Sequence, residues 1–152
     1  MLLRSRAWES GGEIPLRFTG YGGGTSPPLT FSDPPEGTRS FALIVTDLDS
    51  RFRPLVHWVL YDIPGTVAGL SEGISKETPV LADGSCQGTG GLGERGYFAP
   101  RPPRGQHRYR FRLYALSGSV GLGPGLKAKE LELAIQSRTL RTADLLGTCT
   151  RP

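Results

Sequence analysis

Three short segments rich in β-branched and aromatic residues most constrain the fold of this chain. They are Phe41 to Thr46, Leu55 to Tyr61 and His107 to Leu116, and turn-forming stretches separate them. Such composition favours β-strands. The first two segments are apolar on both faces, which is typical of strands covered on both sides. No helical pattern separates the strands, as a doubly wound α/β fold would require, so the sequence predicts a mainly β structure.

The third segment alternates in character along its length. Side chains on a strand point to opposite faces at successive residues, so apolar and basic residues separate onto two faces here. The first face carries His107, Tyr109, Phe111, Leu113 and Ala115. The second face carries Arg108, Arg110 and Arg112. We therefore expect one face of this strand to meet the core and the other to meet solvent.

The remaining segments predict turns and a helix near the C-terminus. Pro64 to Gly73 and Asp83 to Gly105 are too polar and too rich in glycine for regular structure. Lys127 to Leu140 has helix-forming composition and one apolar side. Its apolar residues are Leu131, Ala134 and Ile135. Ala143 to Leu146 is predicted to add a short helical turn, which completes a β-sandwich with one or two peripheral helices.

The composition indicates one small domain without disulfides. A chain of 152 residues suffices for a single domain, which we assign to residues 1–152. Cys86 and Cys149 form no CxxC or metal-ligand pattern, so two free thiols in a reducing compartment are expected. The first eight residues lack a signal-peptide core, and no segment has the roughly 20 apolar residues of a membrane span. A cytoplasmic location is therefore expected.

Only two histidines occur, and both lie in predicted strands. His57 is inside the second strand and His107 opens the third. Asp47 and Asp49 follow directly after the first strand, where a carboxylate can accept a hydrogen from an imidazole and fix its tautomer. The alternatives are a histidine whose hydrogen bonds are satisfied within the fold, and an Asp-x-Asp sequence that only begins a turn. The histidines and acids together indicate an inward cavity at one end of the sandwich.

The segment Gly96 to Gly105, GYFAPRPPRG, is predicted to be a rigid loop that leads into His107. Its three prolines fix the backbone, and such a loop either presents backbone N–H groups to an anion or serves only as a long turn. The formal charge of +4 comes largely from arginine, which favours contacts with phosphate or carboxylate. No nucleophile elbow, Walker motif, His-Glu-x-x-His or dinucleotide fingerprint is present, so no standard enzyme motif supports catalysis.

Several separate motifs together resemble the phosphatidylethanolamine-binding protein family, which includes the Raf kinase inhibitor-like proteins, and its short bacterial and archaeal branch in particular. The motifs are SPPLTF (Ser26 to Phe31), PEGTRSFALIVTDLDS (Pro35 to Ser50), VHWVLYDIPG (Val56 to Gly65), GYFAPRPPRGQHRYRFRLYAL (Gly96 to Leu116) and LLGT (Leu145 to Thr148). Their order and spacing agree across nearly the whole chain. The resemblance implies a sandwich of two antiparallel sheets with Greek-key connections.

The resemblance also implies a small pocket for phosphate-like or carboxylate anions, including phospholipid head groups. Matching positions in this sequence are Asp47, Asp49, His57, Tyr97, Pro103, His107 and Tyr109. The chain departs from the family pattern at Leu48, where the family has proline, and at Gly90-Gly91, where it has Asn-Asp. Ala99 replaces a glycine that lets an anion approach the backbone, and Arg101 adds a charge-assisted donor nearby. Both are candidate site residues.

Four functions follow from these residues. The first is a non-catalytic binding protein without a cofactor, whose pocket takes a small anion or a phospholipid head group, with peripheral membrane contact. The second, implied by the resemblance, is regulation of a kinase or a serine protease by protein contact. The third is a hydrolase with Asp47 and His57 as an acid/base pair. The fourth is nucleic-acid binding through Arg101, Arg104, Arg108, Arg110 and Arg112. We disfavour it because no base-stacking aromatic residues share the strand face that carries the arginines. Since some prokaryotic relatives are dimers, a homodimer is a further expectation.

Overall fold

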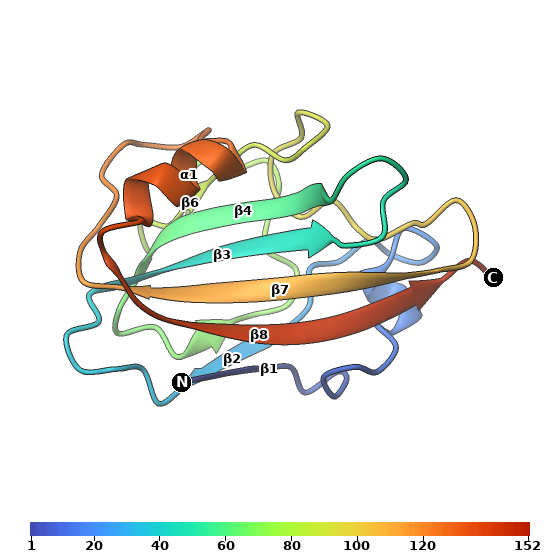
Figure 1. The fold of residues 1–152 in the computed structure, drawn as a ribbon, viewed down its shortest axis with the longest axis horizontal. Helices are drawn as coiled ribbons and strands as arrows, with labels where there is room; N and C mark the ends of the chain where they lie inside the picture. Colours follow the sequence, from blue (N-terminus) through green and yellow to red (C-terminus); the bar gives the residue numbers. More distant parts are fainter.

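Two antiparallel β-sheets pack face to face in the computed structural model, which describes residues 1–152 (Figure 1). The larger sheet has the strand order β6-β4-β3-β7-β8, and the smaller has the order β1-β2-β5. The larger sheet comprises β3 (Ser40–Asp47), β4 (Leu55–Pro64), β6 (Cys86–Gln87), β7 (Gln106–Leu116) and β8 (Thr139–Thr150). The smaller comprises β1 (Leu2–Arg4), β2 (Leu29–Ser32) and β5 (Gly69–Leu70). The predicted sandwich of two antiparallel sheets is confirmed.

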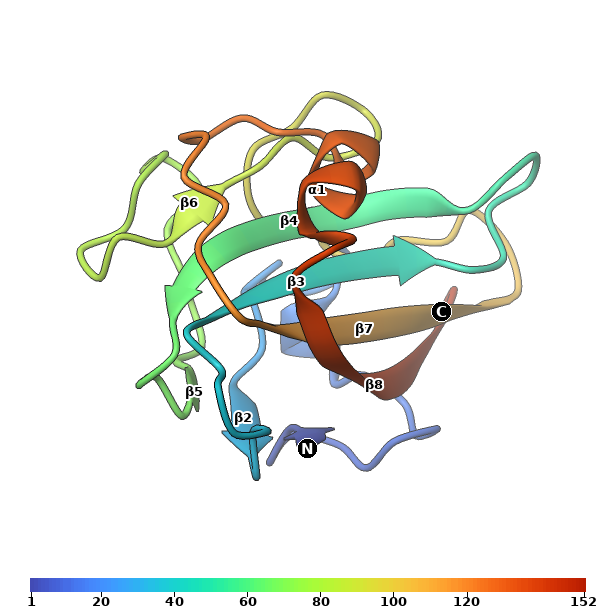
Figure 2. The same ribbon diagram turned by 60° about the vertical axis from the view of Figure 1, so that its left-hand side comes forward.

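The central strand β3 is buried along its whole length because both of its faces are covered. Leu43 and Val45 belong to the core between the two sheets. Ala42 and Ile44 belong to a second core under the helix α1 (Ala128–Ile135), which lies on the outer face of the larger sheet (Figure 2). The alternation of β7 also holds, since Tyr109, Phe111, Leu113 and Ala115 are buried while the arginines between them are not.

The C-terminal prediction is partly wrong. The helix ends at Ile135 rather than Leu140, and Ala143 to Leu146 lies within β8 and forms no helical turn. The reason is tertiary, because β8 pairs with β7 from Thr139 to Thr150 in an antiparallel ladder that is interrupted only by a register shift near Leu116. Its inward positions include a glycine and a cysteine, so a period-two apolar pattern was hard to see in the sequence.

The stretches expected to be irregular contain short strands. β5 lies within Pro64 to Gly73 and β6 within Asp83 to Gly105, and each pairs at the edge of its sheet. A 3₁₀ helix, η1, spans Leu16–Phe18. Cys86 and Cys149 are free buried thiols in the two separate cores. The structure has no helix of the length and apolar character needed to cross a bilayer.

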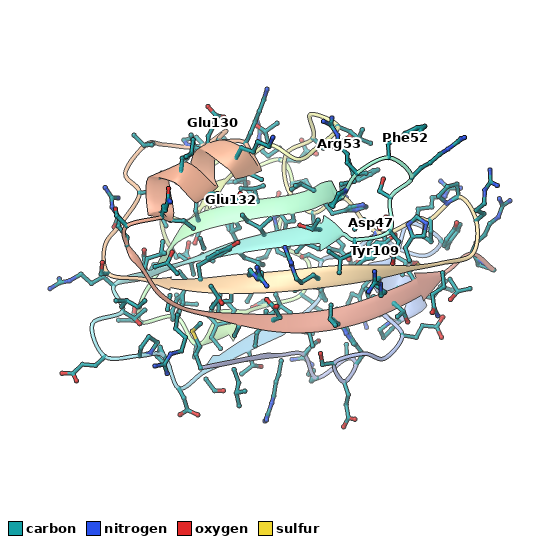
Figure 3. The ribbon with its side chains drawn as sticks, in the orientation of Figure 1. Asp47, Phe52, Arg53, Tyr109, Glu130 and Glu132 are labelled. Atoms are coloured by element: carbon teal, nitrogen blue, oxygen red, sulfur yellow. The ribbon has the colours of Figure 1, made fainter.

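One end of the larger sheet gathers the residues singled out from the sequence. Asp47 is the last residue of β3 and faces Tyr109 of β7 on one side and Leu55 of β4 on the other. Asp47 and Tyr109 lie at the strand ends, below the loop that joins β3 to β4 (Figure 3). Strand pairing therefore brings together side chains that are about 60 residues apart in the chain.

Candidate functional site

A cavity of about 730 Å³ opens at this end of the sheet. Its volume falls within the range of small-molecule sites. Seven of the nine residues predicted from the sequence line it: Asp47, Asp49, His57, Arg101, Pro103, His107 and Tyr109. Strands β3, β4 and β7 supply its floor, and the Gly96 to Gly105 loop forms part of its wall.

Tyr97 and Ala99, which were also expected at the site, are not among the residues that line this cavity. Both side chains are buried in the core between the sheets. The Tyr97 hydroxyl donates a hydrogen bond of 2.7 Å to the carbonyl of Phe18. Alternate residues of an extended segment point to opposite sides, so Phe98 reaches the pocket while its neighbours Tyr97 and Ala99 point inward. Arg101 lies beyond this alternation and also lines the pocket.

Asp47 and His107 form a hydrogen-bonded pair in the floor of the cavity. Nδ1 of His107 lies 2.7 Å from Oδ2 of Asp47, which is almost fully buried. The other oxygen of Asp47 accepts a bond of 2.8 Å from the Asp49 amide and so closes the turn after β3. Because the carboxylate accepts, Nδ1 of His107 carries the hydrogen and Nε2 is the nitrogen left over.

A β-bulge turns His57 into the same cavity. Val45 on β3 faces Trp58 on β4, yet the next β3 residue faces Val56, so His57 has no cross-strand partner. In a regular strand Val56 and Trp58 would share a face. Instead Trp58 packs between the sheets, and Val56 packs on the helix side. The extra residue re-aims the imidazole, whose ring centroid lies 5.2 Å from that of Tyr109.

The His57 ring is held by the loop opposite. Its Nδ1 lies 2.6 Å from the carbonyl oxygen of Phe98, and the two rings stack with centroids 5.0 Å apart. A carbonyl only accepts, so Nδ1 donates. Burial lowers the pKa of His57 below its ordinary value of 6.5, against smaller opposing effects from the Phe98 carbonyl and the Asp47 carboxylate. The ring is therefore neutral at pH 7, and Nε2 has no hydrogen-bond partner.

Tyr109 also places an unpartnered group in the cavity floor. Its side chain is fully buried, and its hydroxyl lies close to the Asp47 carboxylate without forming a hydrogen bond of normal geometry. Burial, with a further contribution from the neighbouring Asp47 carboxylate, raises the pKa of Tyr109 far above its usual range. The phenol is therefore a neutral donor at any physiological pH.

Asp49 lines the cavity but is engaged elsewhere. Its Oδ2 accepts hydrogen bonds of 2.8 Å from the Arg108 amide and 2.9 Å from Nε of Arg108. Its Oδ1 accepts another of 2.9 Å from Nη2. The hydrogen bond from the Arg108 side chain lowers the pKa of Asp49 to about 2. Asp49 thus braces the turn after β3 and neutralises an arginine of the outer face.

The mouth of the cavity is basic. Arg51, Arg101 and Arg104 line it, and none of them forms an ion pair with a carboxylate. The Arg101 guanidinium stacks over the ring of Tyr21 at 5.5 Å. Sequence reasoning did not assign Arg51, Arg104 or Phe98 to the site. No sequence signal marks a residue such as Phe98 that contributes a backbone carbonyl.

Comparisons with known proteins show which family the chain belongs to. A family model for the phosphatidylethanolamine-binding protein matches residues 4–150. A UPF0098 protein of Aquifex aeolicus is 42% identical over 146 residues, covering 94% of this chain and 84% of the relative. A UPF0098 protein of Methanothermobacter thermautotrophicus is 40% identical over 147 residues and covers 97% of each chain. The chain belongs to the phosphatidylethanolamine-binding protein family.

Solved structures show the same fold. A putative phosphatidylethanolamine-binding protein homologue of Chlamydia trachomatis superposes with a TM-score of 0.89 at 34% identity, covering 99% of this chain and 97% of its own. YbcL of Escherichia coli, described as a member of the mammalian family, superposes with a TM-score of 0.91 at 27% identity, covering 99% and 98%. Family membership supports a binding protein of this type.

Proposed function

We propose that this protein binds a small phosphate-like or carboxylate anion in the cavity floored by Asp47, His57, His107 and Tyr109, without chemical turnover. The observation that carries the proposal is a pair of buried polar atoms without partners, Nε2 of His57 and the hydroxyl of Tyr109. Buried polar groups are nearly always hydrogen-bonded, because leaving one unpaired costs about 1–3 kcal/mol. A ligand that reaches both atoms recovers this cost.

The charges around the cavity favour an anion over a cation. Both carboxylates of the site already have partners within the protein, since Asp47 accepts a hydrogen bond from His107 and Asp49 forms an ion pair with Arg108. The three arginines of the mouth have no acidic partner, so the field at the entrance is positive. Guanidinium groups suit phosphate and carboxylate because they donate two parallel hydrogen bonds.

The surface beside the mouth favours a phospholipid head group as the source of the anion. The side chain of Phe52 is 88% exposed at the tip of the β3–β4 loop, and Leu92 on the cavity rim is 62% exposed. Phe52 and Arg53 project away from the sheet (Figure 3). The guanidinium of Arg51 lies 5.0 Å from the Phe52 ring. Apolar tips flanked by arginine suit the interface of an anionic bilayer, which supports peripheral membrane contact.

Anion binding is tested by calorimetric titration with inorganic phosphate at low salt. We expect wild-type protein to bind and Arg101→Ala to bind several-fold more weakly, because one unpaired charge leaves the mouth. Arg141→Ala is the matched control, since Arg141 is exposed and pairs with Ala115 at the far end of β8. Equal loss in both variants would mean a general charge effect without a defined pocket.

Membrane contact is tested by sedimentation with vesicles of phosphatidylcholine containing anionic lipid. Phe52→Ser is expected to reduce the bound fraction while leaving the affinity for inorganic phosphate unchanged. Vesicle binding that is indifferent to Phe52 would reject the membrane surface. A kinase or serine protease as the partner of this face remains the second proposal, and inhibition that depends on Phe52 in the absence of lipid would favour it.

A further inference from the structure

His57 presents a hydrogen-bond acceptor, where a pocket for anions would be expected to hold only donors. Its Nδ1 must carry a hydrogen, because it lies 2.6 Å from a carbonyl oxygen that only accepts. Its Nε2 is buried without a partner, and the residue as a whole is 3% exposed. In the neutral ring this second nitrogen has a lone pair and no hydrogen. The floor of the cavity therefore combines a donor, the Tyr109 hydroxyl, with an acceptor.

The surroundings of the ring hold it in this neutral state. Charged and titratable side chains surround the ring or line the cavity with it: Asp47 at the end of β3, Asp49 and Arg51 in the β3–β4 loop, Glu94, Arg101 and Arg104 between β6 and β7, and His107 and Tyr109 on β7. Asp47 and Glu94 favour a charged imidazole, and His107 opposes it. Burial outweighs both acids and lowers the pKa of His57. Asp47 already accepts a hydrogen bond from His107.

We propose that the ligand of this cavity donates a hydrogen to Nε2 of His57, so the site selects acids that still carry one hydrogen, such as the monoanion of a phosphate monoester. This inference rests on the proposed anion-binding function and specifies its ligand class. A phosphate diester has no P–OH group, so its oxygens would set lone pairs against the lone pair of Nε2. A free monoester and a lipid with a monoester head group share the selected chemistry.

A fully ionised ligand binds only if Nε2 takes a proton from solvent. Burial makes that protonation unfavourable, because the charged imidazole loses its hydration. A monoanion that brings its own hydrogen avoids this cost and leaves its remaining oxygens free for Tyr109, His107 and the arginines of the mouth. The two atoms that lack partners within the protein thus define a ligand with one donor and several acceptors.

Methyl phosphate and dimethyl phosphate provide the test. At about pH 5.5, below the second phosphate pKa of about 6, both are mainly monoanions and differ by one O–H group. Calorimetry of the wild-type protein is expected to show methyl phosphate binding roughly ten- to a hundredfold more tightly, the effect of one hydrogen bond to a charged group. Equal affinities, or tighter binding of the diester, overturn the inference and leave the anion site intact. If neither ligand binds, the proposed function fails and the inference falls with it.

Two further measurements keep the result independent of folding defects. In His57→Gln the amide offers either an acceptor or a donor near the position of Nε2, so binding is expected to persist while the preference for the monoester shrinks. Side-chain ¹⁵N spectra of the wild-type protein, which has only two histidines, read the hydrogen on each ring nitrogen directly. We expect Nδ1 of His57 to be protonated and Nε2 bare at pH 7, because a pKa below 6.5 keeps the ring neutral there. A protonated Nε2 in the free protein overturns the inference.

Discussion

Removing the hydroxyl of Tyr109 is predicted to strengthen folding while weakening anion binding. This hydroxyl is buried without a partner, which costs the native state about 1–3 kcal/mol. Tyr109→Phe keeps the ring, whose contacts with the inter-sheet core are unchanged. The free energy of unfolding should therefore rise by about 1 kcal/mol or more, a shift of about 2–4 °C in melting temperature for a domain of this size.

The same substitution at Tyr97 is the matched control and should have the opposite sign. Tyr97 is also fully buried in that core, but its hydroxyl donates to the Phe18 carbonyl at 2.7 Å. Tyr97→Phe removes this bond and leaves a buried carbonyl with one acceptor site unpaired, which costs about 1–2 kcal/mol.

The assay is urea unfolding of both variants, combined with phosphate titration. Phosphate affinity should fall roughly tenfold or more in Tyr109→Phe, because a hydrogen bond from the phenol to a charged ligand is lost. It should be unaffected in Tyr97→Phe. If Tyr109→Phe destabilises the protein as much as Tyr97→Phe does, the Tyr109 hydroxyl has a partner in the native state and the reasoning about an incomplete cavity floor is refuted.

Two other perturbations follow from the structure. Below pH 6.5 the unfolded chain binds more protons at His57 than the folded protein does, so this residue makes stability fall as the pH is lowered from 7 towards 5. The urea midpoint of His57→Gln should therefore fall less than that of the wild type over this interval. An equal dependence of the two midpoints on pH would contradict the lowered pKa. A Cβ at Gly147 would lie 2.5 Å from Cγ1 of Ile14, so Gly147→Ala should lower the free energy of unfolding by about 1–3 kcal/mol. A Cβ at Gly118 would meet open space, so Gly118→Ala should leave the free energy of unfolding nearly unchanged in the same urea experiment.

The strands of the larger sheet could be predicted where their composition was decisive. β3 and β4 are apolar on both faces, and β7 alternates cleanly, so each was visible in the sequence. β8 was missed in part because Gly147 and Cys149 occupy inward positions that normally reveal a strand by large apolar residues. β1, β2, β5 and β6 are two to four residues long, too short for a period to emerge.

The site was predictable as a set of residues but not as a geometry. Acids after one strand and histidines in two others indicated an Asp–His contact, and the structure places it between Asp47 and His107. The orientation of His57 depends on a β-bulge, which a pattern of alternating side chains cannot reveal. Tyr97 was placed in the pocket by resemblance, although its side chain points into the core.

The central claim, a cavity that binds a small anion through the residues around Asp47, is tested most directly by calorimetric titration of inorganic phosphate into the wild-type protein and His107→Ala. His107 is only partly buried and its side chain contacts the cavity, so we expect the variant to stay folded. The account predicts saturable binding to the wild-type protein and at least tenfold weaker binding to the variant. Binding of equal strength in the two proteins, or no binding to the wild type up to millimolar phosphate, would contradict it.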